Sequence, residues 1–314
     1  MMKRVLAAAL SCLLLLMAGC GGQPQEKEKK LSKLTIGLMP DTDSIPFIIA
    51  AEHGYFAEEG VEVELVPFKS AMERDAALQS GNLDGAISDL LAVIFARSGG
   101  FAVHATSYTD GNYNLVAGGN AGISAPADLR GKEIAISRNT IIEYVTDEIL
   151  AVNGIEEKEI SKVVIPQIPV RLEMLQSGNL GAAVLPEPMA SVAAASGSRY
   201  VTGSGELGIN PGVIVFSDAS IQEKEASIRA MYRAYNKAVN YLNNTPRADY
   251  IDLVMEKSGF PAPARDALEL KPYRSAGLPA QQDVEEAVHW VKSKDLAGSY
   301  SYDDLVSKLL AEEK

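Results

Sequence analysis

The chain has 314 residues, of which 47% are hydrophobic and 22% are charged, a globular composition with enough length for two domains. The formal net charge of −12 argues against nucleic-acid binding, because there is no basic surplus to neutralise phosphates. Both cysteines, Cys12 and Cys20, fall near the N-terminus, and the three histidines are scattered. We therefore expect no disulfide, no thiolate nucleophile, no metal site and no cofactor in the folded body.

The N-terminus has the pattern of a secretory signal. Lys3 and Arg4 precede an apolar run from Val5 to Met17, which is shorter than the roughly 20 residues that a membrane-spanning helix needs. The run ends in Leu16-Met17-Ala18-Gly19-Cys20, which resembles the lipobox of bacterial lipoproteins, with Met17 where Leu is usual. The alternative is a plain secretory signal with an incidental cysteine.

The lipobox resemblance implies that residues 1–19 are removed and that Cys20 becomes the mature N-terminus and carries lipid. Acyl chains hold a protein at a bilayer surface without spanning it. Residues 20–33 are polar and lack apolar periodicity, which predicts a flexible tether. We expect the protein to be extracytoplasmic and lipid-anchored to a bacterial membrane.

Strands and helices are predicted to alternate through the first half of the folded body. Short apolar runs indicate strands, and their alternation with helices favours a parallel sheet covered on both faces. The capping box of Ser70 and Glu73 is a clear helix start. The expected elements are a strand at 34–39, a helix at 47–53, a strand at 61–68, a helix ending at Gly81, a strand at 84–88, a helix from Asp89 and a strand at 101–105.

The second half continues the pattern and then becomes mainly helical. A strand at 114–117 is expected to enter a flexible crossover at 118–122, and the chain is expected to return through 208–212. The remaining elements are strands at 133–136, 162–165, 182–185 and 213–216, and helices from 141, at 170–176, from 186, and at 221–244, 248–257, 280–292 and 302–312.

One hexapeptide occurs twice. Leu-Gln-Ser-Gly-Asn-Leu stands at 78–83 and again at 175–180, an offset of 175 − 78 = 97 residues. Arg74 and Arg171 match at the same offset, whereas Asp89 and Glu187 are one residue out of register. Each copy ends a helix at a glycine and leads into an apolar strand, which predicts two similar α/β lobes in one chain.

Four motifs in order resemble those of solute-binding proteins for sulfonate, taurine, nitrate and thiamine-pyrimidine importers. They are Pro46-Phe47 with Ala51-Glu52-His53-Gly54-Tyr55-Phe56-Ala57-Glu58-Glu59-Gly60-Val61, Gln79-Ser80-Gly81-Asn82-Leu83-Asp84-Gly85-Ala86, Asp128-Leu129-Arg130-Gly131-Lys132-Glu133-Ile134-Ala135-Ile136 and Leu185-Pro186-Glu187-Pro188. The resemblance implies a two-lobed periplasmic-binding-protein fold of the second type, with ligand held between lobes. Each lobe is then a mostly parallel α/β sheet flanked by helices. We expect residues 34–117 and 213–314 to form the first lobe and residues 118–212 the second.

Polar residues gather where expected strands end and helices begin. In open α/β sheets, ligands bind beyond the carboxyl ends of strands, and helix N-termini favour negative charge. The predicted ligand-binding residues are Asp41, Asp43, Ser44, Ser70, Asp89, Tyr108, Ser137, Arg138, Asn139, Thr140 and Glu187.

The four carboxylates in this set would favour a cation or a polar, N–H-bearing ring, and Arg138 and Lys69 would oppose that preference. For Asp41 and Asp43, a role as solvent-facing helix caps is an open alternative. Asp89 and Glu187 end corresponding strands, so we expect them to meet across the gap between the lobes.

The resemblance implies a solute-binding lipoprotein that delivers a small polar ligand to an ABC permease with a separate ATPase, since the chain has no phosphate-binding Gly-Lys-Ser/Thr motif. We expect a monomer without enzymatic activity. Two alternatives stay open. One is a sensory lipoprotein that presents ligand to a receptor, and the other is an enzyme of the thiamine-pyrimidine synthase type. The signal peptide and the lack of a Cys-rich segment argue against the enzyme.

Overall fold

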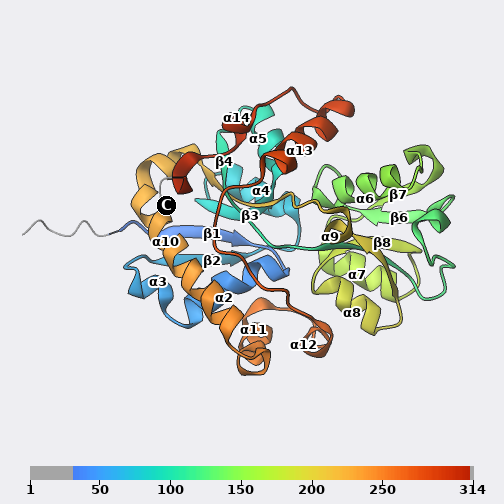
Figure 1. Cartoon of the computed structure of the whole chain (residues 1–314), viewed down its shortest axis with the longest axis horizontal. Coiled ribbons are helices and arrows are strands. Elements are labelled where there is room, and N and C mark those ends of the chain that lie inside the picture. The colour runs from blue at the N-terminus through green and yellow to red at the C-terminus, as the bar shows by residue number, and fades with distance from the viewer. Residues whose placement is uncertain (1–30, 312–314) are drawn as a thin grey trace, which may run out of the picture. The chain divides into compact units, whose positions relative to one another are not determined.

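The computed structural model describes residues 31–311 (Figure 1). The expected signal peptide and the lipid-anchor residue Cys20 lie outside the described residues, as does most of the expected tether. Within the described part of the chain, no helix is both long and apolar enough to cross a membrane.

The first sheet has five strands in the order β2-β1-β3-β10-β4. Four strands point the same way, and β10 runs antiparallel to its neighbours β3 and β4. The strands are β1 (Leu34–Leu38), β2 (Val63–Pro67), β3 (Gly85–Asp89), β4 (Val103–Tyr108) and β10 (Gly212–Ser217).

The second sheet repeats this design with the order β7-β6-β8-β5-β9. Here β5 is the strand that runs antiparallel to its neighbours. The strands are β5 (Tyr113–Ala117), β6 (Glu133–Ile136), β7 (Ser161–Val164), β8 (Ala182–Pro186) and β9 (Arg199–Gly203). In each sheet the antiparallel strand is the first strand after the chain crosses from the other sheet. Each sheet is therefore mostly parallel, as predicted, and is mixed because one strand is reversed.

The assignment of residues 114–117 to the first lobe is wrong, because β5 pairs with β8 and β9 in the second sheet. The chain passes from the first sheet to the second through residues 109–112 and returns through residues 204–211. The first crossing thus precedes the glycines at 118–122. An apolar strand can pair in either sheet, and its partners are distant in sequence, so periodicity alone did not locate it.

Helices cover both faces of each sheet (Figure 1). The helices packed around the first sheet are α2 (Ile45–Glu52), α3 (Tyr55–Glu58), α4 (Ala71–Gln79), α5 (Leu90–Ser98), α10 (Asp218–Asn244) and α13 (Gln281–Ser293). Those around the second are α6 (Ile141–Val152), α7 (Ile168–Gln176), α8 (Met189–Ala195) and α9 (Ser204–Leu207).

The C-terminal region touches both lobes. Helix α11 (Ile251–Ser258) packs on α2 of the first lobe, whereas α12 (Ala264–Ala267) packs on α8 of the second. The chain then returns to α13, which packs on α5. The helix expected at 302–312 is instead two short pieces, α14 (Tyr302–Leu305) and the 3-10 turn η5 (Lys308–Leu310).

The repeated hexapeptide forms the same turn in both lobes. Gly81 has φ = 77° and Gly178 has φ = 76°. Glycine adopts this left-handed conformation without the strain that a side chain would cause. In both turns the asparagine side chain donates to the serine hydroxyl at 2.9 Å, Asn82 to Ser80 and Asn179 to Ser177. The predicted internal repeat is therefore confirmed at the level of individual hydrogen bonds.

Candidate functional site

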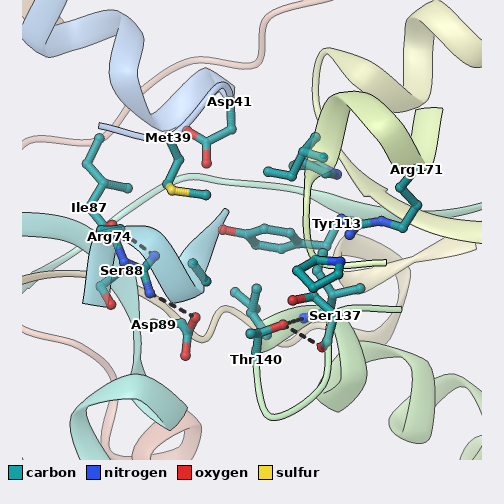
Figure 2. Close-up of a pocket in the computed structure, with 16 residues that line it drawn as sticks. Met39, Asp41, Arg74, Ile87, Ser88, Asp89, Tyr113, Ser137, Thr140 and Arg171 are labelled. Carbon is teal, nitrogen blue, oxygen red and sulfur yellow. Dashed lines mark hydrogen bonds and ion pairs between the residues drawn. The ribbon is translucent and has the colours of Figure 1, made fainter. Parts of the chain in front are cut away.

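A cavity lies between the two sheets, at the edge where the strands of both lobes end. We call it the interlobe cavity; its free volume is about 30 Å³. It is lined by residues from both lobes: Met39, Asp41, Ala71, Arg74, Ile87, Ser88, Asp89, Tyr113, Ser137, Thr140, Ile141, Ile142, Pro166, Ile168, Arg171 and Pro186 (Figure 2). This volume leaves room for one or two water molecules, so the two lobes are close together here.

Helix N-termini converge on the interlobe cavity. Ala71, Ile141 and Ile168 are the first residues of α4, α6 and α7, and all three line it. The backbone N–H groups at a helix start carry partial positive charge. The cavity therefore lies beyond the carboxyl ends of the strands, where ligands bind in parallel α/β sheets. The positive potential of the helix N-termini favours negative charge there.

The first lobe contributes a buried arginine that has carboxylate partners. The guanidinium of Arg74 donates to the carbonyl of Ile87 at 3.1 Å and lies 2.7 Å from Asp75 and 4.0 Å from Asp89. Burial lowers the pKa of Arg74, but the two carboxylates outweigh this effect and raise it. The charge of Arg74 is thus balanced within its own lobe.

The second lobe contributes an arginine without such partners. Arg171 is fully buried, and it donates from Nε to the carbonyl of Val184 at 2.9 Å and from Nη1 to that of Ile165 at 2.7 Å. Its Nη2 has no hydrogen-bond partner, and no carboxylate of the described residues forms an ion pair with it. Burial alone lowers the pKa of Arg171 to about 10, so it stays charged at neutral pH.

The two arginines are equivalent by the internal repeat. Both lie thirteen positions before the strand residue whose carbonyl they bind. At the offset of 97 residues, however, the partners Asp75 and Asp89 of the first lobe become Leu172 and Pro186. The second lobe therefore has the buried cation but neither of the two counter-charges.

Asp41 enters the interlobe cavity from the first lobe, on the side opposite Arg171 (Figure 2). It is 5% exposed, and its Oδ1 has no hydrogen-bond partner. Burial raises the pKa of Asp41 to about 7, although Arg74 opposes this shift. Burial and the charge of Asp41 together hold the pKa of neighbouring Asp43 well above its usual range. Asp43 accepts a hydrogen bond from the Tyr113 hydroxyl at 3.5 Å.

Four of the predicted ligand-binding residues line the interlobe cavity: Asp41, Asp89, Ser137 and Thr140. Asp89 and Thr140 also cap helices, accepting from Ala92 N–H at 2.9 Å and from Ile142 N–H at 3.2 Å. Burial raises the pKa of Asp89, and the charge of Arg74 opposes this. For these residues a capping role and a place at the cavity coexist.

Glu187 lies in a different place from Asp89. It lines a second cavity of about 230 Å³, beside Asp110, Lys271 and Tyr273. Its carboxylate accepts from the Asn114 side chain at 2.7 Å, and burial raises its pKa. The expectation that Asp89 and Glu187 meet across one gap is therefore wrong, because the counterpart of Asp89 is Pro186 and the next residue points elsewhere.

The other predicted residues do not line the interlobe cavity. Ser44 is buried and donates to the carbonyl of Met39 at 2.6 Å. Ser70 caps α4 by accepting from Glu73 N–H at 3.3 Å, as predicted. Tyr108 donates to the carbonyl of Ser275 at 2.7 Å, away from the cavity. Asp43 is buried behind Asp41, whereas Arg138 and Asn139 are exposed on the loop before α6.

Sequence reasoning missed the arginines as site residues, along with Tyr113 and Ser88. It noted that Arg74 and Arg171 match but assigned them no role. The signal was present, because the same offset turns two aspartates near Arg74 into a leucine and a proline near Arg171. That difference has meaning only once the aspartates are known to pair with Arg74.

Backbone hydrogen bonds join the lobes beside the interlobe cavity. Thr42 N–H donates to the carbonyl of Glu187 at 2.9 Å, and Ile168 N–H donates to that of Lys69 at 3.1 Å. Since each bond links residues of different lobes, the structure is a closed arrangement of the two lobes.

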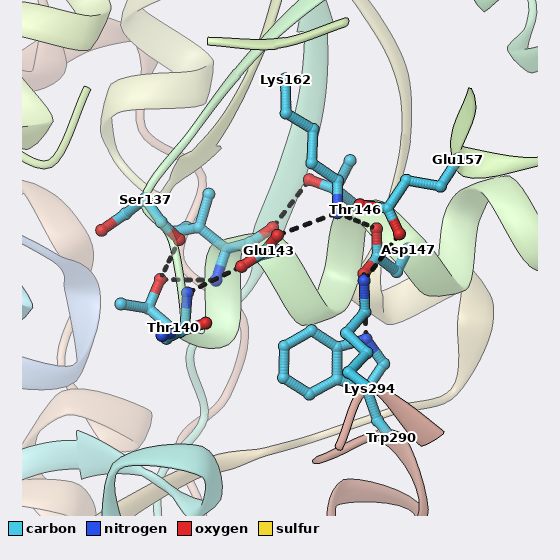
Figure 3. Close-up of polar contacts among 11 residues, drawn as sticks. Ser137, Thr140, Glu143, Thr146, Asp147, Glu157, Lys162, Trp290 and Lys294 are labelled. Carbon is cyan, nitrogen blue, oxygen red and sulfur yellow. Dashed lines mark hydrogen bonds and ion pairs between the residues drawn. The ribbon is translucent and has the colours of Figure 1, made fainter. Parts of the chain in front are cut away.

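A polar network joins the lobes at another position (Figure 3). Asp147 of α6 accepts from the indole N–H of Trp290 at 3.0 Å and lies 2.7 Å from both Lys162 and Lys294. Burial opposes the ionisation of Glu157, but hydrogen bonds from Lys162 and Lys294 lower the pKa of this residue to about 2. The cationic and aromatic side chains of α13 and the residue after it thus bind acidic residues of the second lobe.

The network reaches the loop that lines the interlobe cavity. Lys162 also pairs with Glu143 at 2.9 Å, and Glu143 accepts from the backbone N–H of Asn139 at 2.7 Å. Asn139 has a positive φ of 57° and lies between Ser137 and Thr140, which line the cavity. Among the described residues, no group of three or more His, Cys, Asp and Glu side chains could hold a metal ion.

Comparisons with known proteins agree with this architecture. A family model described as NMT1/THI5 like matches residues 41–249. No curated protein matches the chain in sequence. The ligand-binding component of an ABC-type import system from Staphylococcus aureus, solved with zinc bound, superposes with a TM-score of 0.77 at 16% identity, covering 90% of this chain and 99% of that one.

Two further structures share the fold. The alkanesulfonate-binding protein SsuA from Xanthomonas axonopodis pv. citri, bound to MOPS, has a TM-score of 0.74 at 18% identity and covers 85% of this chain and 94% of its own. The desulfurization enzyme DSZB has a TM-score of 0.64 at 14% identity, with 89% and 98% covered. At these identities the likeness shows the fold alone. The chain belongs to the NMT1/THI5-like family and has the periplasmic-binding-protein fold, which confirms the resemblance found in its sequence.

Proposed function

We propose that this protein captures a small polar molecule between its two lobes and delivers it to an ABC permease driven by a separate ATPase. The observation that carries the proposal is the interlobe cavity, whose lining contains buried charged side chains from both lobes. One structural neighbour is named as the ligand-binding component of an ABC-type import system and another as an alkanesulfonate-binding protein, and both names support the same function.

The proposed cycle is an opening and closing of the lobes around the ligand. In this proposal residues 34–108 with 212–311 form one moving body and residues 113–203 the other, joined by 109–112 and 204–211. A ligand that contacts both bodies stabilises the closed state, because those contacts are lost when the lobes separate. The permease then binds the protein in its closed state.

Attachment to a bacterial membrane is part of the proposal and is supported by the sequence. The lipobox-like segment that ends at Cys20 would hold the protein at the extracytoplasmic surface, where a permease is reached by diffusion in two dimensions. Labelling with a lipid precursor tests this directly. Wild type should incorporate label, and Cys20→Ser should not.

Ligand capture is tested with the single tryptophan of the chain, Trp290, which donates to Asp147 across the lobe interface. A library of small polar molecules is screened by thermal shift, since a ligand that binds only the folded state raises its melting temperature. Each hit is then followed by Trp290 fluorescence and by the radius of gyration in solution. We expect hits to change both. Hits that raise the melting temperature without either change would contradict capture between lobes.

Delivery and its alternatives are separated by two further measurements. An importer component should stimulate ATP hydrolysis by its reconstituted permease only when ligand is present. A sensory protein would leave that hydrolysis unchanged and bind a receptor domain instead. An enzyme would convert the ligand, which mass spectrometry after incubation would detect; we expect the ligand to be recovered unaltered.

A further inference from the structure

We propose that the ligand is a compact zwitterion, with an acidic group against Arg171 of the second lobe and a protonated nitrogen against Asp41 of the first. This inference rests on the proposed function and adds the chemical class of the ligand. Figure 2 shows the two side chains entering the interlobe cavity from opposite sides.

Arg171 identifies the acidic end of the ligand. A buried cation without a counter-charge is unfavourable, because burial removes the water that would solvate it. Arg171 is fully buried, two of its three nitrogens bind carbonyls, and Nη2 is left without a partner in the lining of the cavity. A carboxylate or sulfonate oxygen at this nitrogen supplies the charge and the acceptor together.

The internal repeat shows that the missing counter-charge distinguishes Arg171 from Arg74. The Nη2 of Arg74 also lacks a hydrogen-bond partner, but it lies 2.7 Å from a carboxylate oxygen of Asp75. Arg74 binds its strand carbonyl as Arg171 does, and it is nevertheless paired with Asp75 and Asp89. The carbonyl contact therefore does not require an unpaired guanidinium. In the second lobe Leu172 and Pro186 leave the position of the counter-charge open to a ligand.

Asp41 identifies the other end. Its Oδ1 is buried at the cavity and has no hydrogen-bond partner, although the N–H groups of Asp43 and Ser44 face the carboxylate and partly stabilise its charge. Arg171 does not fill this role, because the two side chains form no ion pair within 4.0 Å. An ammonium group carries up to three N–H donors and a positive charge, so it satisfies the oxygen that lacks a partner and favours the ionised carboxylate.

The two ends are held by different lobes, which ties recognition to closure. In an open state, either group of the ligand would contact at most one of the two side chains. Only the closed state satisfies both, so a zwitterion has the differential affinity that closure requires. The free volume of about 30 Å³ has room for only one or two water molecules, so the lobes must close less far around the ligand than they do in this structure. A compact molecule requires the smallest such change.

The test is a calorimetric titration with matched probes. The zwitterions are the twenty standard amino acids, 3-aminopropanoate and 2-aminoethanesulfonate. For each, an analogue without nitrogen, such as ethanesulfonate, and an analogue without acid, such as ethylammonium, is titrated under the same conditions. We expect at least one zwitterion to bind roughly 30-fold or more tightly than both of its analogues, as for a buried charge pair that loses one partner.

Two variants assign the ends of the ligand. Asp41→Asn keeps the shape of the side chain and should weaken the zwitterion roughly 30-fold while leaving the nitrogen-free analogue unchanged. Arg171→Met should abolish binding of both, whereas Arg171→Lys should restore part of it. Arg97→Gln is the matched control, because Arg97 also donates to a strand carbonyl, that of Val103 at 3.1 Å, but does not line the cavity. Circular dichroism checks that each variant is folded.

The outcomes separate this inference from the proposed function. If a singly charged or neutral probe binds as tightly as the zwitterions and closes the lobes, the inference is overturned and the proposed function stands. If no probe of any class binds, both are overturned. If Asp41→Asn weakens the nitrogen-free analogue as much as the zwitterion, Asp41 does not hold the nitrogen and the inference is again overturned.

Discussion

The two lobes contain the same buried arginine in two electrostatic settings. Arg74 lies 2.7 Å from Asp75 and 4.0 Å from Asp89, and these carboxylates raise its pKa. Arg171 binds two backbone carbonyls and has an Nη2 without a partner, and burial lowers its pKa to about 10. One arginine is balanced within the protein, and the other is balanced only when something else supplies an anion.

The proposed binding site depends on this difference between the two repeats. Both arginines donate to a central carbonyl of the strand that follows their helix, a contact that the two lobes share. In the first lobe, Asp75 and Asp89 balance the charge of Arg74 without a ligand. In the second lobe the partners are Leu172 and Pro186, so the same scaffold presents an unpaired charge to the interlobe cavity.

The comparison is tested most strongly by giving the first lobe the surroundings of the second. Asp75→Leu removes the carboxylate nearest to Arg74, and we expect the free energy of unfolding to fall by about 3 kcal/mol, because a buried charge is left with a distant partner. Urea denaturation measures the change. The control is Asp252→Leu, which removes an exposed pair with Arg265 at 2.7 Å and should change stability by less than about 1 kcal/mol. Equal effects of the two substitutions would show that burial does not matter here.

The reciprocal change gives the second lobe the surroundings of the first. Pro186→Asp places a carboxylate at the position equivalent to Asp89, next to Arg171. We expect the affinity for an acidic ligand to fall roughly 100-fold, since the protein then supplies the counter-charge itself and the two anions repel. Calorimetry with the tightest probe measures this. Unchanged affinity, with a folded variant, would contradict the role given to Arg171.

The free energy of unfolding should depend on pH through Asp41, which among the described residues has no ion-pair partner of the kind that Asp75 and Asp89 have in Arg74. Because the pKa of Asp41 is about 7 in the folded state and 3.8 unfolded, the folded state holds more protons between these values. Stability without ligand should therefore fall by about 2–3 kcal/mol from pH 5 to pH 8 through this group.

A comparison of wild type with Asp41→Asn isolates the contribution of Asp41. The charged groups that face Asp41, Asp43 and Arg74, are present in both proteins. The variant should lose this component of the pH dependence, which urea denaturation at several pH values measures. Parallel curves for the two proteins would show that Asp41 is ionised at its ordinary pKa.

The repeated turns test whether the lobes are equivalent away from the cavity. Gly81→Ala and Gly178→Ala each force a side chain into a left-handed conformation, with no neighbouring atom within 4 Å of the new Cβ. Each should lower the free energy of unfolding by about 1–2 kcal/mol, and by similar amounts. A large difference between the two would mean that the lobes do not unfold as one unit.

The smallest effect is expected from the polar network between the lobes. Asp147→Asn removes a charge that Lys162, Lys294 and Trp290 share. We expect the closed state to lose about 1 kcal/mol, so that ligand binds roughly fivefold more weakly and Trp290 fluorescence shifts toward that of the open form. Glu156→Gln, at an exposed pair with Lys158, is the control and should have no effect on either reading.

Much of the fold could be predicted because its signals are local. The N-cap at Ser70, the helix start at Thr140 and the glycine turns at 81 and 178 depend on neighbouring residues only, and all of them are present. The predicted capping box is formed only in part, because the Glu73 carboxylate accepts from the N–H of Lys69 and not from that of Ser70. The sheet to which β5 belongs could not be predicted, because a short, mainly apolar strand fits either sheet and its partners are distant in sequence.

The candidate site was predicted in part for the same reason. Asp41, Asp89, Ser137 and Thr140 follow strands, and position along the chain suffices to bring such residues to the cavity. Glu187 does not share that cavity because one residue of displacement turns a side chain to the other face of a strand end. The importance of Arg171 depends on which carboxylates are absent around it, which only the folded arrangement shows.

The central claim is tested most directly by a crystal structure of the protein with its tightest-binding probe. We predict an acidic oxygen of the probe within hydrogen-bond distance of Arg171 Nη2 and a nitrogen within the same distance of Asp41 Oδ1. A probe seated instead in the second cavity beside Glu187 and Lys271, with Arg171 still unpaired, would contradict this account.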